Sequence, residues 1–66
     1  FNSKLSDRQL EVMRLLYEGK SDSEIADKLF ISLNTVNNHR KNSFRKVGVH
    51  SFPEFMRYAM QNNLFK

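Results

Sequence analysis

Asparagine and basic side chains share one face of a helix predicted at residues 33–47. Asn34, Asn38, Lys41 and Arg45 are spaced i, i+4, i+7 and i+11, so they align on a helix that turns by about 100° per residue. An asparagine amide can pair with both N6 and N7 of adenine in the major groove of DNA, and Lys or Arg can reach guanine or a phosphate. This face therefore has the groups needed to bind a duplex.

The same face could instead be a solvated surface without a partner. Solvated helix faces usually mix both charge signs, whereas this face carries no acidic side chain and is flanked by two further asparagines, Asn37 and Asn42. Asparagine is also a weaker helix former than Glu, Lys or Gln, which would stabilise a merely solvated helix better. These two features favour a binding face.

Charge is divided unevenly along the chain. Residues 1–27 carry four Lys or Arg against six Asp or Glu, a net charge of −2, and residues 28–66 carry seven Lys or Arg against one acid, a net charge of +6. A basic half of this kind is typical of a protein with a polyanionic partner, although many basic surfaces only keep a protein soluble. Charge alone does not decide between the two.

Four helix starts are expected to position these residues. Ser6, Ser21 and Ser51 are each followed three residues later by Gln or Glu, the spacing of a capping box in which each side chain satisfies a free backbone N–H. Ser32 has the same role for another helix, with Thr35 in place of the acid. The chain therefore contains a start signal before each of four predicted helices.

Glycine marks the ends of two helices, since Gly19 and Gly48 fall where a left-handed residue ends a helix. Phe30 and Ile31 fill the short connection between the second and third helices, which suits a helix-turn-helix. There is no strand pattern, and the sequence predicts an all-α, four-helix helix-turn-helix domain with helices at about residues 7–18, 22–30, 33–47 and 52–62.

The predicted helices differ in how much of their surface is apolar. The first is apolar around most of its circumference, so we expect it at the centre of the fold. On the third, four apolar residues lie opposite the asparagines: Leu33, Val36, Phe44 and Val47. Arg40 and Ser43 fall on this inward side too. We expect Arg40 to bury its stem and pair with a carboxylate such as Glu11 or Glu24.

Several classes of function are not expected. The chain has no cysteine, so neither a disulfide nor a thiolate zinc site can form. We expect neither of its two histidines, His39 and His50, to form a catalytic pair with an acid. No stretch approaches the roughly 20 apolar residues that cross a bilayer. We expect no enzyme activity, metal, cofactor, small-molecule ligand or membrane contact, and a cytoplasmic, nucleoid-associated location.

Four segments carry a resemblance to a known family: LSDRQLEV at 5–12, GKSDSEIA at 19–26, LFISLNTVNNH at 29–39 and KVGV at 46–49. In this order and spacing they resemble the LuxR/GerE-type helix-turn-helix of bacterial transcription regulators, without a gap over about residues 5–59. The resemblance implies a DNA-binding domain at residues 1–66 that forms the C-terminal module of a longer regulator. A phosphoacceptor receiver or a ligand-binding domain would precede it.

The resemblance also implies roles for residues of the third helix, which would enter the major groove. The family's base contacts map to Asn37, Asn38 and Lys41. Further groove or backbone contacts are expected from five residues, on the resemblance or on their place in the helix: Ser32, Asn34, Thr35, Arg45 and Lys46.

Some positions depart from the family pattern. Asn37 stands where the family usually has lysine, and it falls at the edge of the exposed face, so Asn38 and Lys41 carry the prediction better than Asn37 does. Phe52 occupies a position that is often arginine, and Gln9 replaces a frequent glutamate but can still complete its capping box. Whether Asn37 reads a base or faces water stays open.

The fourth predicted helix has more apolar surface than one packed side requires. Its apolar side chains spread over roughly 200° of arc. Met56 and Met60 could form a self-complementary dimer surface, which would place two copies on a two-fold-related DNA site. A fully covered helix, or one in contact with another domain, is the alternative.

Two other functions remain open for the whole chain. A sigma-factor region 4-like module uses a similar helix-turn-helix, but its recognition helix lies close to the chain end, whereas a further capped helix follows here. A helical protein-interaction domain would not bind DNA at all. The expected partners are double-stranded DNA and a second copy of the chain, with RNA polymerase as a further candidate.

Overall fold

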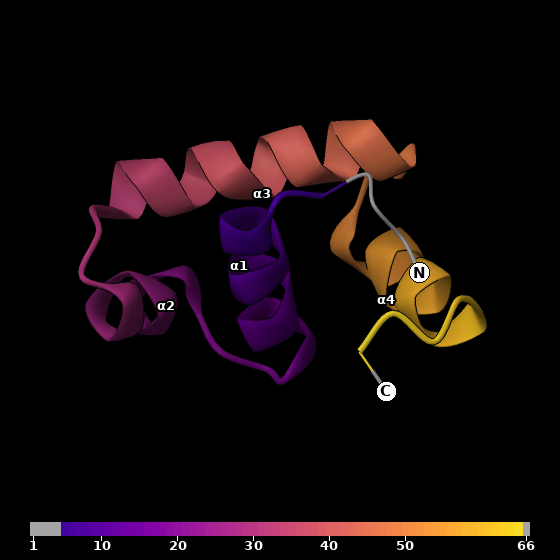
Figure 1. The fold of residues 1–66 in the computed structure, drawn as a ribbon, viewed down its shortest axis with the longest axis horizontal. Helices are drawn as coiled ribbons and strands as arrows, with labels where there is room; N and C mark the ends of the chain where they lie inside the picture. Colours follow the sequence, from indigo (N-terminus) through magenta and orange to yellow (C-terminus); the bar gives the residue numbers. More distant parts are fainter. Residues whose placement is uncertain (1–4, 66) are drawn as a thin grey trace.

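The computed structural model describes residues 5–65, which form four helices and no strand (Figure 1). The all-α prediction is confirmed. Residues 1–4 and 66 of the predicted domain lie outside the described residues. Every helix begins where the sequence predicts, and three of them end one residue earlier than predicted. Their bounds are α1 Asp7–Tyr17, α2 Asp22–Leu29, α3 Leu33–Val47 and α4 Phe52–Gln61.

α3 runs along one side of the molecule, with α1, α2 and α4 all on its other side (Figure 1). The core lies where the four helices meet. Each helix contributes at least one side chain with no exposed surface, namely Val12 and Met13 of α1, Ile25 of α2, Val36 of α3 and Phe55 of α4. α1 lies in the middle, as its nearly continuous apolar surface predicts. The opposite side of α3 is not covered by any described helix.

Capping boxes fix the start of α1 and α2 as predicted. The Ser6 hydroxyl accepts from the N–H of Gln9 at 3.2 Å, and the Gln9 side chain accepts from the N–H of Ser6 at 3.1 Å. Ser21 and Glu24 make the same pair of bonds at 3.2 and 2.8 Å. Each box satisfies two backbone donors that an uncapped helix would leave free.

The start of α4 differs from the predicted capping box. Ser51 accepts from the N–H of Glu54 at 3.3 Å, but the Glu54 carboxylate accepts from the N–H of His50 at 2.6 Å and not from that of Ser51. The φ angle of Ser51 is −151°, against −72° at Ser6 and −81° at Ser21. This rotation turns the Ser51 N–H away from the glutamate, which reaches one residue further back.

The predicted helix ends are confirmed at both glycines, with φ values of 97° at Gly19 and 81° at Gly48. α2 ends without a glycine, because Phe30 itself takes the left-handed conformation at φ 57°. The prediction that Phe30 fills the turn is wrong: its side chain is 93% exposed, since the left-handed backbone directs it outward, while Ile31 packs against the core.

The inward side of α3 follows the predicted pattern with one exception. Val36 is fully buried, Ser43 is 1% exposed, and Phe44 stacks on Phe55 with the ring centroids 5.7 Å apart. Leu33, predicted to face inward, is 48% exposed. It lies at the first position of α3 and about 60° around the helix from Val36, so it sits at the margin of the core.

Among residues 5–65, no helix has both the length and the apolar character that crossing a membrane requires.

Candidate nucleic-acid interface

The outward side of α3 presents the predicted asparagine and basic residues to solvent. Asn34, Asn38, Lys41 and Arg45 are all exposed. No described helix lies over this side of α3 (Figure 1), and the helix contains no acidic residue from end to end. The structure thus places these four on one uncovered surface of α3, whose only charged side chains are basic.

Two hydroxyl groups, those of Ser32 and Thr35, form a hydrogen bond at the N-terminus of α3. Ser32 accepts from the N–H of Thr35 at 3.0 Å, and the two side-chain oxygens lie 2.8 Å apart in a hydrogen bond. Ser32 is exposed and Thr35 half-buried. Ser32 therefore caps the helix, and its exposure at a helix N-terminus, where backbone N–H groups favour an anion, leaves it able to meet a phosphate as well.

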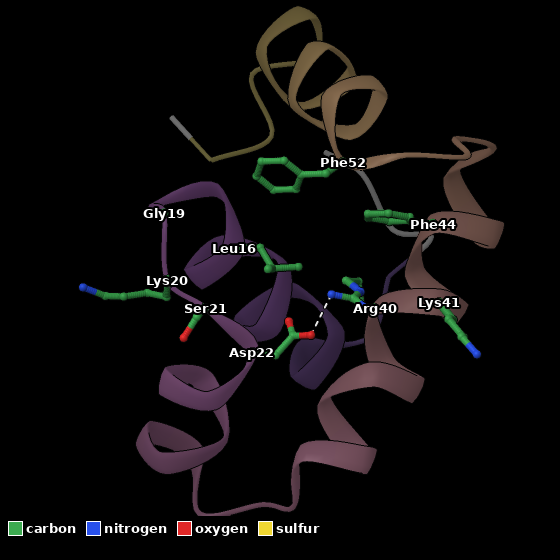
Figure 2. Close-up of a pocket in the computed structure, with 9 residues that line it drawn as sticks. All are labelled: Leu16, Gly19, Lys20, Ser21, Asp22, Arg40, Lys41, Phe44 and Phe52. Atoms are coloured by element: carbon green, nitrogen blue, oxygen red, sulfur yellow. Dashed lines mark hydrogen bonds and ion pairs between the residues drawn. The ribbon is translucent and has the colours of Figure 1, made fainter.

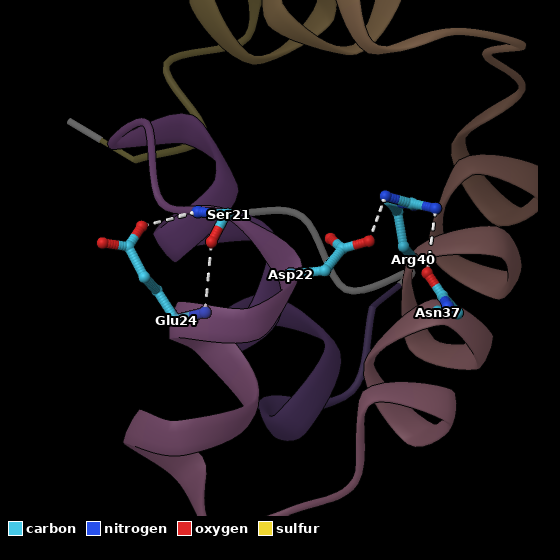
Figure 3. Close-up of polar contacts among 5 residues, drawn as sticks. All are labelled: Ser21, Asp22, Glu24, Asn37 and Arg40. Carbon is cyan, nitrogen blue, oxygen red and sulfur yellow. Dashed lines mark hydrogen bonds and ion pairs between the residues drawn. The ribbon is translucent and has the colours of Figure 1, made fainter.

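Arg40 makes the most specific polar contacts on α3 (Figure 3). Its Nη1 donates to Asp22 Oδ2 at 2.7 Å, and its Nη2 donates to Asn37 Oδ1 at 3.0 Å. The Arg40 and Asp22 side chains are 33% and 24% exposed, so the pair lies between α2 and α3 and not in open solvent. Arg40 thereby joins the two helices of the helix-turn-helix.

The expected carboxylate partner of Arg40 was wrong, although its inward position is correct. Glu24 is engaged by the N–H of Ser21 in the capping box, and Glu11 pairs with Arg8 at 3.2 Å. Asp22, at the first position of α2, takes the place of both. Its short side chain on an early turn of α2 reaches the guanidinium from across the helix pair.

A second contact, which the sequence reasoning missed, joins α3 to α1. Lys46 Nζ donates to Gln9 Oε1 at 3.2 Å, and the same oxygen accepts from the Ser6 N–H. Gln9 is 8% exposed, so the amide is held inside the fold while the lysine is exposed. The two residues lie 37 positions apart, and no periodic pattern in the sequence connects them.

An open groove of about 640 Å³ lies between α3, the turn after α1 and the start of α4 (Figure 2). The Asp22–Arg40 pair lies along it, and Phe44 and Phe52 form its apolar end. Lys20 and Lys41 line the groove, and their ammonium groups point to opposite sides of it (Figure 2). The basic groups therefore do not converge there, and the outward side of α3 remains the place where they gather.

α4 divides into buried and exposed apolar positions. Phe55 and Ala59 are buried in the core, Met56 is half-buried, and Met60 is 60% exposed. Phe52, at the start of the helix, is 41% exposed. The predicted dimer residues thus differ: Met60 offers apolar surface to solvent, whereas Met56 packs largely against the core.

The capping box at the start of α2 also lowers the pKa of one acid, Glu24. The backbone N–H of Ser21 donates to Glu24 and lowers the pKa of this carboxyl below its ordinary value of 4.5, because the bond favours the charged form. Desolvation opposes this shift, while the side chain of Ser21 and the charge of Lys20 add to it. Glu24 is therefore held as a carboxylate at the start of α2.

A short α2, a tight turn and a longer α3 with one uncovered side define a helix-turn-helix domain. Residues 3–59 match the family of bacterial regulatory proteins of the luxR type, and the chain belongs to this family. The family resemblance found in the sequence is thereby confirmed. The family is a class of DNA-binding transcription regulators and not of enzymes.

The chain is also similar in sequence to known bacterial regulators. The chain is 40% identical over 62 residues to the oxygen regulatory protein NreC of Staphylococcus aureus strains JH9, JH1 and Mu3. The match covers 94% of this chain but 29% of each relative, so the chain spans less than a third of the length of the curated relatives it matches.

Proposed function

We propose that this domain binds double-stranded DNA sequence-specifically, with α3 in the major groove. One observation carries the proposal: α3 has a side that no described helix covers and that presents asparagine and basic side chains without a single acid. Amide groups can distinguish base edges, and positive charges attract the phosphates on either side of the groove. The luxR family supports the same function.

Individual residues would divide this work. Asn38 and Lys41 are exposed on the outward side of α3 and would contact base edges, and Asn37 would join them from the margin. Positioning contacts to the groove or backbone would come from residues at both ends of the helix: Ser32, Asn34, Thr35, Arg45 and Lys46. Lys46 can reach a phosphate only by sharing or leaving Gln9, to which it donates in the free domain.

Dimerisation through α4 would place two copies on a two-fold-related site. Met60 is 60% exposed and supplies apolar surface for such a contact, while the half-buried Met56 would contribute its edge. The regulator would act in the cytoplasm, associated with the nucleoid, and RNA polymerase would be a further partner. A receiver or ligand-binding domain would precede this module, as the family resemblance implies, and the relatives, more than three times as long as the match, have room for one.

Selection from a random duplex pool tests the proposal. The purified domain should enrich one sequence, and its affinity should fall steeply with salt as phosphate contacts release counterions. Enrichment of a two-fold-related sequence would support the dimer, and sedimentation showing a monomer both on and off DNA would contradict it. No enrichment and no salt-dependent binding would leave the helical protein-interaction domain as the better description.

Substitution of Lys41 tests whether DNA affinity depends on this position of α3 or only on the net charge of the domain. Lys41→Ala should weaken binding and, if the lysine meets a phosphate, reduce the slope of log affinity against log salt by about 1. Lys20→Ala is the matched control, since it removes the same charge from the turn after α1, where the side chain points to the side opposite Lys41 (Figure 2). Equal losses in the two variants would contradict the assignment of Lys41 to the interface.

A further inference from the structure

Asn37 lies where the inward and outward sides of α3 meet, and Arg40 orients its amide. The Arg40 guanidinium is 3.0 Å from one terminal atom of Asn37. A guanidinium has only donors, so the atom facing it must be the amide oxygen. The usual ambiguity between the oxygen and nitrogen of an asparagine amide is therefore resolved by chemistry. The Nδ2 group, with its two N–H donors, is the end of the amide that does not face Arg40.

Arg40 is itself held in place before any ligand arrives. Its Nη1 donates to the Asp22 carboxylate at 2.7 Å, a charge-assisted bond of the stronger kind. Both side chains are largely shielded from solvent, at 33% and 24% exposure. The guanidinium thus bridges two acceptors, one on α2 and one on α3, and fixes the plane of the Asn37 amide (Figure 3).

A bidentate contact to adenine requires both ends of an amide. The oxygen must accept from N6 while the nitrogen donates to N7, so both must point at the same base edge. In this structure the oxygen of Asn37 points back toward Arg40 and Asp22 (Figure 3). Within residues 5–65 no hydrogen bond from Asn37 Nδ2 is made, so this group is available to a ligand as a donor only.

We propose that Asn37 reads DNA as a donor-only side chain that selects guanine, through its N7 and O6 acceptors, over adenine at one base pair. Asp22 and Arg40 act as positioning residues that set this preference without touching the base. The inference rests on the proposed DNA binding and deepens it. It also gives a reason why Asn37 can stand where the family usually has lysine, because a lysine is likewise only a donor.

The test compares base preferences at every position of the selected duplex. Dissociation constants are measured for duplexes carrying each of the four bases at each position, for the wild-type domain and for Arg40→Met. Methionine keeps an apolar stem of similar length but cannot donate, so the Asn37 amide becomes free to rotate. At one base pair the ratio of adenine to guanine affinity should rise by about 5-fold to 150-fold, the range of one good bidentate contact.

Three further variants distinguish a change in base preference from a general loss of DNA affinity. Asn37→Lys, which keeps a donor-only side chain, should retain the guanine preference at that base pair, and Asn37→Asp, which has no donor, should lose it. Arg57→Met, which removes an arginine from α4, should leave all base preferences unchanged. If Arg40→Met does not fold, as circular dichroism would show, Arg40→Lys replaces it and should give a smaller shift in the same direction, since an ammonium bridges two acceptors less well.

The outcomes distinguish this inference from the proposed function. A wild-type domain that enriches no duplex overturns DNA binding and this inference together. A domain that binds a selected site but shows the same base preferences in the wild type and in Arg40→Met overturns the inference alone. Wild-type selection of adenine at the base pair that responds to Asn37→Asp does so as well.

Discussion

The two sides of α3 belong to the same helix but are held in different ways. On the inward side Val36 and Ser43 have at most 1% of their surface exposed, and Arg40 bonds across to α2. On the outward side the side chains of Asn38 and Lys41 are exposed. The inward side is therefore where changes alter the free energy of unfolding, and the outward side is where they alter binding and little else.

Asn37 does not belong to only one of these two sides. Its oxygen is bound by an inward-side residue, and its nitrogen makes no hydrogen bond within residues 5–65. A change at Arg40 should therefore alter both stability and base preference, whereas a change at Val36 or Asn38 should alter one of them. The contrast between the two sides can be tested from the largest expected effect to the smallest.

The largest effect is expected at the core that α3 packs against. Phe55→Ala removes a fully buried ring that stacks on Phe44, and it should cost about 3–5 kcal/mol of unfolding free energy. Urea denaturation measures this cost. Phe52→Ala, on the same helix but 41% exposed, is the comparison and should cost clearly less unfolding free energy, because a large part of its ring already contacts solvent. Similar losses for both would mean that the core is placed incorrectly.

The outward side should show the opposite pattern. Asn38→Ala should cost about 1–3 kcal/mol of binding free energy and relax one base position, because it removes an amide that reads a base edge. The unfolding free energy should stay within about 0.5 kcal/mol of the wild type, since Asn38 is exposed. An equal loss of affinity on all duplexes would reduce Asn38 to a positioning contact.

The link between α2 and α3 should have an intermediate effect on stability. Arg40→Ala should lower the unfolding free energy by about 1 kcal/mol, the upper end for a pair that keeps some contact with solvent. A double-mutant cycle with Asp22→Ala isolates the ion pair from the lost packing of the arginine stem. A coupling energy of zero in this cycle would show that the pair does not hold the two helices together.

The smallest effect is expected outside α3, at the capping box that starts α2. The lowered pKa of Glu24 means that its contribution to stability is fully present above pH 4.5 and is lost as the pH falls through the folded-state value. Glu24→Gln keeps a side chain that can accept the Ser21 N–H but does not titrate. The difference in Tm between the wild type and this variant should shrink as the pH falls below 4.5, and a constant difference would contradict the assignment.

Periodicity and capping patterns were enough to predict which side of α3 faces inward. The helix starts follow from Ser6, Ser21, Ser32 and Ser51, because local spacing determines whether a hydroxyl can cap. The burial of Ser43 likewise follows from its angle on the helix, and its hydroxyl is satisfied within α3 by donating to the His39 carbonyl. These are properties of one helix at a time.

Contacts between helices were predicted less well. That Arg40 needs a carboxylate follows from its inward position, but the choice of Asp22 depends on how α2 is rotated against α3. The bond between Lys46 and Gln9 depends in the same way on the approach of α1 to α3. The sequence predicts the apolar Phe30 inside the turn, but its left-handed backbone directs the side chain outward. The structure shows where the asparagines of the candidate site lie. Their roles on DNA are proposed.

A map of NMR chemical-shift changes tests the central claim most directly. The labelled domain is titrated with its selected duplex, and the backbone amides and the asparagine side-chain NH2 groups are followed. The account predicts that the largest changes fall on the outward side of α3, with the side-chain NH2 groups of Asn37 and Asn38 among them. Changes concentrated along the groove beside Phe52, with none on the outward side of α3, would show that DNA binds elsewhere and would contradict the account.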